Sequence, residues 1–127
     1  MAKGKLALVL HAHLPYVRSI TPGSLEEDWF FQALMECYLP LLKVLEDSMK
    51  AKNQNPKITI SLSPTLLSLL NDEILKERFP SWLKIRLSIL KKINQENEIA
   101  TEYLSENIKI QLSNWEKYKG NIISRFS

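Results

Sequence analysis

Two short apolar segments, separated by a long helical stretch, constrain the fold of this chain more than any other feature. Residues 6–10 (LALVL) are continuously apolar, which is typical of a strand covered on both faces. Residues 58–62 (ITISL) are rich in β-branched side chains and predict a second strand. A strand, a helix and a strand in this order form a right-handed unit with parallel strands. We therefore expect the carboxyl ends of both strands to lie at the same edge of one sheet.

The helical stretch between the strands has a clear beginning and one internal disturbance. Ser24 and Glu27 have the spacing of a capping box, in which Ser24 caps the helix and the Glu27 side chain reaches back to it. Pro40 lacks an amide hydrogen and deprives the Glu36 carbonyl of its partner. We therefore expect the helix to kink or split near Glu36.

From Ser63 onwards the pattern is helical. Ser63 followed by Pro64 is typical of a helix N-terminus, and Gly120 is typical of a helix C-terminus. Pro80 is expected to separate two helices, and Asn97 lies near a further break. We predict helices at residues 64–71, 73–79, 81–95 and 99–118. The predicted fold class is α/β, with two parallel strands followed by several helices.

Two parallel strands leave both edges of a sheet open, so the predicted architecture is incomplete. No third strand is evident after residue 62, and the helical pattern continues towards the end of the 127 residues. We expect that a partner supplies the remaining strands or that the sequence is part of a longer chain.

Composition argues against several function classes. The net charge of +3 is mild, and the Lys and Arg side chains of residues 76–92 are expected to form a solvated helix face, so no nucleic acid is expected as a partner. Cys37 is the single cysteine; it cannot form an internal disulfide, and its apolar neighbours predict a small buried hydrophobe. No apolar run approaches the ~20 residues of a membrane span or forms a signal-peptide core. We expect a cytoplasmic protein with no membrane partner.

His11 and His13 follow the first apolar run and are the sharpest candidates for chemistry. Residues two apart in a strand point the same way, so both imidazoles are expected on one side of the chain. Such a pair can hold a divalent metal, or it can hydrogen-bond sugar hydroxyls and stabilise charge. The alternative is a pair of core histidines satisfied by backbone groups.

Two further groups have both a structural and a functional interpretation. Ser61 and Ser63 share a face at the end of the second strand, where local hydrogen bonding and an N-cap explain them. The acidic residues 26–28 favour a helix dipole, which explains them without another role. Trp29 is expected to be a core or interface aromatic, or else a flat platform for a sugar ring. No Asp or Glu directly follows a strand, so no carboxylate pair for glycoside chemistry is identified.

Three segments in register resemble the opening of glycoside hydrolase family 57, in particular its 1,4-α-glucan branching enzymes. They are residues 6–18 (LALVLHAHLPYVR), 26–29 (EEDW) and 60–66 (ISLSPTL). The resemblance implies that residues 1–127 are the N-terminal portion of a (β/α)₇ catalytic barrel that acts on α-1,4-glucan, such as glycogen or a starch-like polysaccharide, with retention. It places His13 and His11 beside the sugar, with Trp29 as a further cleft residue, and requires no metal or other cofactor.

The same resemblance implies that the family's catalytic glutamate and aspartate come from later strands. No residue of this chain is therefore assigned a catalytic role, and the chain is expected to be inactive without the remainder of the barrel. Branching, amylase and glucanotransferase activities are not distinguished by these segments.

Two other functions stay open at this point. One is a metal-dependent hydrolase of the deacetylase or amidohydrolase kind, with His11 and His13 as ligands. The other is a non-catalytic subunit that pairs with another chain through its open sheet edge.

Overall fold

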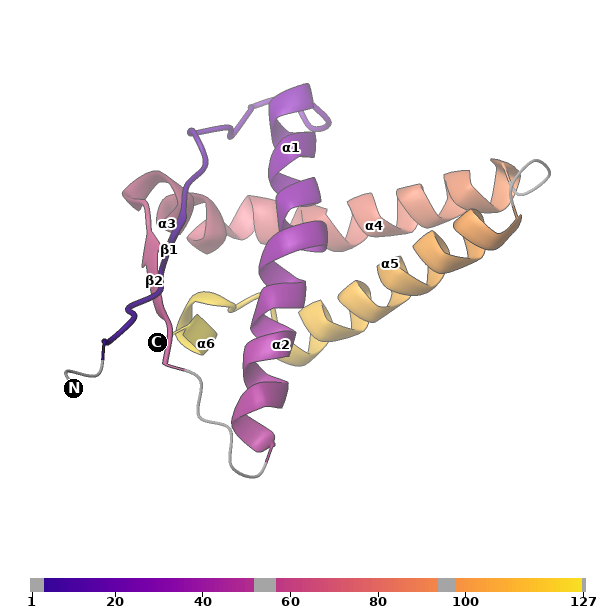
Figure 1. Ribbon diagram of the computed structural model, residues 1–127. Helices are drawn as coiled ribbons and strands as arrows, with labels where there is room; N and C mark the ends of the chain where they lie inside the picture. The colour runs from indigo at the N-terminus through magenta and orange to yellow at the C-terminus, as the bar shows by residue number, and fades with distance from the viewer. Residues whose placement is uncertain (1–3, 52–56, 94–97, 127) are drawn as a thin grey trace.

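The computed structural model describes residues 4–51, 57–93 and 98–126 (Figure 1). It contains two short strands and a set of helices. The strands are β1 (Val9–Ala12) and β2 (Thr59–Leu62). The helices are α1 (Leu25–Ala33), the π-helical turn η1 (Leu34–Tyr38), α2 (Leu39–Lys50), α3 (Pro64–Asn71), α4 (Glu73–Ile93), α5 (Glu98–Tyr118) and α6 (Ile123–Phe126). The predicted break near Asn97 falls outside the described residues.

The two strands are parallel and adjacent, as predicted, and His11 pairs with Ser61 in the register. The first strand was predicted at residues 6–10 but lies at Val9–Ala12. The position of the partner strand explains this shift. The partner, β2, begins at Thr59, whose amide donates to the Leu8 carbonyl. Earlier residues have no neighbouring strand to pair with in the described part of the chain.

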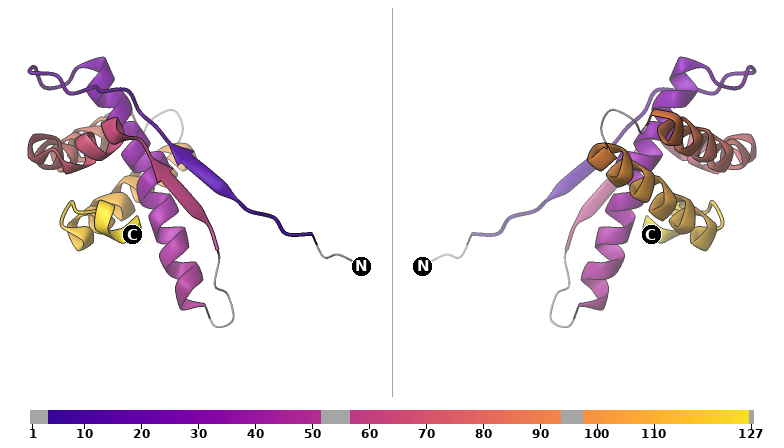
Figure 2. Two further views of the ribbon diagram at one scale, coloured as in Figure 1. Left: turned by 90° about the vertical axis from the view of Figure 1, so that its left-hand side faces the viewer. Right: turned by 90° about the vertical axis from the view of Figure 1, so that its right-hand side faces the viewer.

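The expectation that this strand is covered on both faces is wrong for the described residues. Leu6 is 95% exposed and Val9 is 60% exposed. Ala12 and Leu62 pack against the helical core, so helices cover one face of the strand pair. The left view of Figure 2 shows the opposite face of the strands uncovered.

Helices α1, η1 and α2 form one helical column beside the strands (Figure 1). The predicted disturbance near Glu36 is present as a π-helical turn, in which the Leu39 amide donates to the Leu34 carbonyl five residues earlier. This turn accommodates Pro40, which has no amide hydrogen to donate, without ending the helix. The prediction for Cys37 is wrong: its side chain is exposed, because the turn directs Leu34 and Tyr38 inward instead.

The predicted separation at Pro80 is also wrong, because α4 runs without interruption from Glu73 to Ile93 with Pro80 inside it. A proline in a helix interior costs about 3 kcal/mol in isolation. Phe79 and Leu83, on either side of Pro80, are both fully buried, and their burial offsets that cost. The predictions for α3 and α5 are confirmed to within one residue, and the Gly120 amide closes the end of α5 by donating to the Trp115 carbonyl.

The core lies where the α1–α2 column crosses α4 and α5 (Figures 1 and 2). Its centre is aromatic: Phe79 contacts Phe31 and Trp115, with ring centroids 5.6 Å and 4.8 Å away. In the described part of the chain no helix combines the length and apolar character needed to cross a membrane.

Candidate functional site

The carboxyl ends of the two strands bring His11, His13 and Ser61 together. The two imidazole rings are stacked, with centroids 6.1 Å apart and planes 15° apart, which confirms that both lie on one side of the chain. His11 Nδ1 is 3.2 Å from the Ser61 hydroxyl, a bond that joins residues 50 positions apart in sequence. The local hydrogen bonding predicted for Ser61 is therefore replaced by a contact across the sheet.

Both histidines are exposed, so the interpretation as core histidines is wrong. Their position follows from strand alternation. Ala12 and Leu14 pack against the helical core, so His11 and His13, which alternate with them, point away from it. The imidazoles therefore lie on the uncovered face of the strand pair, where a ligand can reach them.

The backbone around His13 is fixed on both sides. The Ser63 amide donates to the Ala12 carbonyl at 3.0 Å, and the Thr65 hydroxyl donates to the Leu14 carbonyl at 2.8 Å. Ser63 also caps α3, since its hydroxyl accepts from the Leu66 amide at 3.2 Å, as predicted. The role of Thr65 was not predicted, because a side chain bonding a carbonyl 51 residues away leaves no local signal in the sequence.

Trp29 lies on α1 and is 49% exposed, so it is not a core aromatic. Within residues 4–51, 57–93 and 98–126, no ring contact or hydrogen bond joins it to either histidine. The strand-end group therefore consists of the histidines and Ser61, with Trp29 on a separate element.

Two acidic residues at the start of α1, Glu27 and Asp28, hold α1 and α4 together. The Glu27 carboxylate is 1% exposed; it accepts from Arg78 of α4 at 2.6 Å and from the Gly23 amide at 2.8 Å. The predicted capping box is therefore confirmed at the Ser24 cap, whereas the Glu27 side chain reaches Gly23 instead of Ser24.

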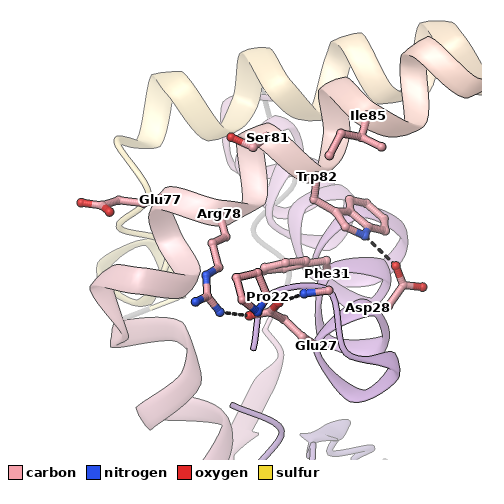
Figure 3. Close-up of a pocket in the computed structure, with 10 residues that line it drawn as sticks. Pro22, Glu27, Asp28, Phe31, Glu77, Arg78, Ser81, Trp82 and Ile85 are labelled. Carbon is pink, nitrogen blue, oxygen red and sulfur yellow. Dashed lines mark hydrogen bonds and ion pairs between the residues drawn. The ribbon is translucent and has the colours of Figure 1, made fainter. Parts of the chain in front are cut away.

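Asp28 forms a second link to α4. It accepts from the Trp82 indole nitrogen at 2.6 Å (Figure 3). It also pairs with Arg86. Since Arg78 and Arg86 bind acidic side chains of α1, residues 76–92 are not simply the solvated basic face that was expected.

A cavity of about 400 Å³ lies between the start of α1 and the first half of α4. Figure 3 shows Phe31, Trp82 and Ile85 along its apolar side, with the Glu27–Arg78 pair at its edge. The carboxylates of Glu27 and Asp28 are already bonded to α4, and neither histidine lines the cavity. This cavity is therefore separate from the strand-end group.

The carboxylates with clearly shifted pKa values, Glu46 and Asp47, are not members of the strand-end group. The Lys117 ammonium, which donates to Glu46 at 2.9 Å, holds the pKa of the Glu46 carboxyl below its ordinary value. A hydrogen bond from Lys43 likewise lowers the pKa of Asp47. Both acids belong to α2, and among the described residues no group of three His, Cys, Asp or Glu side chains is placed to hold a metal ion.

Comparison with known proteins agrees with the strand-end motifs. The profile of Glycosyl hydrolase family 57 matches residues 7–127. A 1,4-α-glucan branching enzyme of Thermococcus kodakarensis is 31% identical over 126 residues, which is 97% of this chain and 18% of that enzyme. A probable 1,4-α-glucan branching enzyme of Mycobacterium tuberculosis is 32% identical over 80 residues, 63% of this chain and 15% of that protein.

Two solved structures have the same arrangement of elements. The GH57-type branching enzyme of Pyrococcus horikoshii superposes with a TM-score of 0.87 and 31% identity, covering 97% of this chain and 24% of that one. The α-amylase AmyC of Thermotoga maritima superposes with a TM-score of 0.85 and 27% identity, covering 98% and 25%.

The solved relatives are (β/α)₇-barrel enzymes that this chain covers in part, so the predicted fold class is confirmed. The chain spans less than a fifth of the length of the curated relatives it matches. The resemblance to a segment of the family's branching enzymes is likewise confirmed, whereas neither these matches nor the described residues support a metal-dependent hydrolase. The chain belongs to glycosyl hydrolase family 57.

Proposed function

We propose that this chain forms one wall of the α-glucan cleft of a retaining branching enzyme, with His13 and His11 in contact with the sugar. The observation that carries this proposal is the stacked imidazole pair, exposed at the carboxyl ends of two parallel strands. Ligands of barrel enzymes bind at this end of the strands. The similarity to 1,4-α-glucan branching enzymes supports α-1,4-glucan as the substrate class.

The uncovered face of the strands supports the same proposal. In a barrel the helices form the outer layer, and the face of each strand turned away from them is the interior. His11, His13 and Val9 lie on the face away from the helical core. The remaining strands of a barrel are therefore the partner that this face requires, and they would enclose the imidazoles in a cleft.

The histidines suit a carbohydrate ligand for chemical reasons. A neutral imidazole has one donor and one acceptor nitrogen, so each ring can bond to a sugar hydroxyl in either direction. Trp29, half exposed on α1, offers a flat surface on which a sugar ring can lie. None of the three groups supplies the carboxylate chemistry of glycosidic bond cleavage.

Retention requires two carboxyl groups about 5 Å apart, one as nucleophile and one as acid and base. Glu27 and Asp28 are bonded to α4, and Glu46 is bonded to Lys117, so these acids are committed to structural contacts. The resemblance to the family implies that its catalytic carboxylates come from later strands, and we propose on that ground that this chain binds glucan without transferring it.

Binding can be tested on the chain itself by titrating maltoheptaose while following the imidazole resonances of His11 and His13. We expect both sets of resonances to shift with maltoheptaose and not with cellohexaose, which has β-linkages. His13→Ala should weaken binding about tenfold, the upper range for one hydrogen bond. Ser68→Ala, on the exposed side of α3, is the matched control and should bind like the original chain. Equal binding of the two variants would remove His13 from the site.

Transfer can be tested in a chimera in which this chain replaces its matching segment in the Thermococcus kodakarensis enzyme. New α-1,6 linkages in amylose, measured by enzymatic debranching, are the readout. We expect the chimera to form branches and the isolated chain to form none. Branch formation by the isolated chain would overturn the assignment of catalysis to other strands.

A further inference from the structure

The start of α3 contains a chain of hydrogen bonds whose direction can be assigned. The Leu66 amide donates to the Ser63 hydroxyl oxygen at 3.2 Å, and the Thr65 hydroxyl donates to the Leu14 carbonyl at 2.8 Å. Ser63 and Thr65 are joined by a third bond, 3.1 Å between their hydroxyl oxygens. Because the Thr65 proton is already committed to Leu14, Ser63 must be the donor in this bond.

This chain of bonds runs from the first turn of α3 to the residue after His13. Each hydroxyl both donates and accepts, and bonds in such a series strengthen one another. Ser63 is buried and Thr65 is half-buried, so water competes little for these groups. The Thr65 hydroxyl therefore has one available orientation, in which its proton is donated to the Leu14 carbonyl.

The effect on His13 follows from the position of the two anchored carbonyls. The Ala12 carbonyl, one residue before His13, accepts from the Ser63 amide at 3.0 Å, and the Leu14 carbonyl is one residue after it. The first bond is part of the strand ladder and exists for any residue at position 63 except proline. The second depends on the hydroxyl of Thr65 alone.

We propose that Thr65 is a positioning residue for His13: its hydroxyl holds the Leu14 carbonyl and so fixes where the His13 imidazole points. The purpose of this placement rests on the proposed glucan site, but the placement itself can be measured without glucan. Thr65 does not contact the sugar and acts only through the backbone of the strand end.

The test uses Thr65→Val, which keeps the shape of the side chain and removes the hydroxyl. Thr65→Ser restores the hydroxyl, and Thr21→Val, at an exposed position before α1, is the matched control for the same chemical change. The first readout is the ¹³C relaxation of the His13 ring in the free protein. The second is the dissociation constant for maltoheptaose.

In the free protein, Thr65→Val is expected to make the His13 ring mobile, while Thr65→Ser and Thr21→Val leave it ordered. The dissociation constant should rise about three- to tenfold in Thr65→Val alone, the factor carried by one ordinary hydrogen bond. An unchanged His13 ring in Thr65→Val, even with lower stability, would overturn the proposal.

Two measurements keep the outcomes distinct. If Thr65→Val does not fold, the exchange rate of the Thr65 hydroxyl proton in the original chain is measured instead. Slow exchange with water supports the bond to the Leu14 carbonyl, and exchange at the rate of a free hydroxyl overturns it. If the original chain binds no maltoheptaose, the proposed function fails, whereas the positioning of His13 is still judged by ring order.

Discussion

Glu27 of α1 and Arg78 of α4, which are 51 residues apart in sequence, form an ion pair of 2.6 Å in which the carboxylate is 1% exposed. Removing one partner of a buried pair leaves the other charge without compensation. Arg78→Ala should therefore lower the free energy of unfolding by about 3 kcal/mol, as measured by urea denaturation.

The control for this prediction is Lys109→Ala, which removes the exposed pair with Glu106 on α5. An exposed pair three residues apart contributes less than about 0.5 kcal/mol. Equal losses in the two variants would mean that burial of Glu27 adds nothing to the Arg78 contact.

Three glycines differ in what opposes an added side chain: backbone strain alone, backbone strain with steric contact, or neither. Gly120 has φ of +66°, and a Cβ atom there would lie 3.2 Å from Trp115 Cζ2, whereas Gly23 has φ of +81° and open space around it. Gly23→Ala should cost about 1 kcal/mol from the left-handed backbone alone. Gly120→Ala should cost more, and Gly4→Ala, which has neither feature, should cost least. Thermal unfolding of the three variants tests this order, which identical melting temperatures for Gly23→Ala and Gly120→Ala would contradict.

The contact between α2 and α5 predicts a dependence of stability on pH. The hydrogen bond from Lys117 lowers the pKa of Glu46 from its ordinary value of 4.5. A carboxyl with a lowered pKa in the folded state stabilises the protein above its unfolded value and loses this effect as the pH falls through the folded value. The original chain should therefore be more stable than Glu46→Gln at pH 7, and the difference should shrink as the pH falls below about 4.5.

Urea denaturation between pH 7 and pH 2.5 measures this difference. Glu102→Gln, on the exposed side of α5, is the control and should show a much smaller change with pH. A difference between the original chain and Glu46→Gln that is constant down to pH 2.5 would exclude the contact with Lys117 as its source.

The exposure of Cys37 predicts reactivity in the folded protein. The thiol is open to solvent in the π-helical turn, so a thiol reagent should modify it without prior unfolding. The measurement is the rate of reaction with a chromogenic disulfide in buffer and in urea. Protection of Cys37 until the urea concentration reaches the unfolding midpoint would contradict the exposed position.

The sequence was sufficient for the features that depend on local chemistry. The parallel strand pair, the Ser63 cap and the side-by-side histidines follow from β-branched residues, a Ser-Pro pair and the two-residue period of a strand. The family resemblance was carried by the same segments.

The features that were not predicted depend on contacts across long sequence separations. Phe79 and Leu83 keep α4 intact through Pro80 because both are buried in a core formed by other elements. Arg78 pairs with Glu27, although the sequence predicted a capping box for Glu27 and a solvated helix face for Arg78. Thr65 reaches Leu14 across the sheet. Propensity and periodicity carry no information about such pairs, because tertiary packing decides them.

The π-helical turn also determines the rotational phase between the two halves of the α1–α2 column. One additional residue in a turn rotates all later side chains by about 100° relative to an uninterrupted α-helix. Leu39 and Leu42 lie in the same core as Phe30 and Leu34 with this rotation included. Loss of a single residue from the turn would leave both halves helical but rotate α2 by about 100° relative to α1, and Leu39 and Leu42 would leave their present positions in the core. The number of residues in this turn is therefore under tighter constraint than the identity of its exposed members.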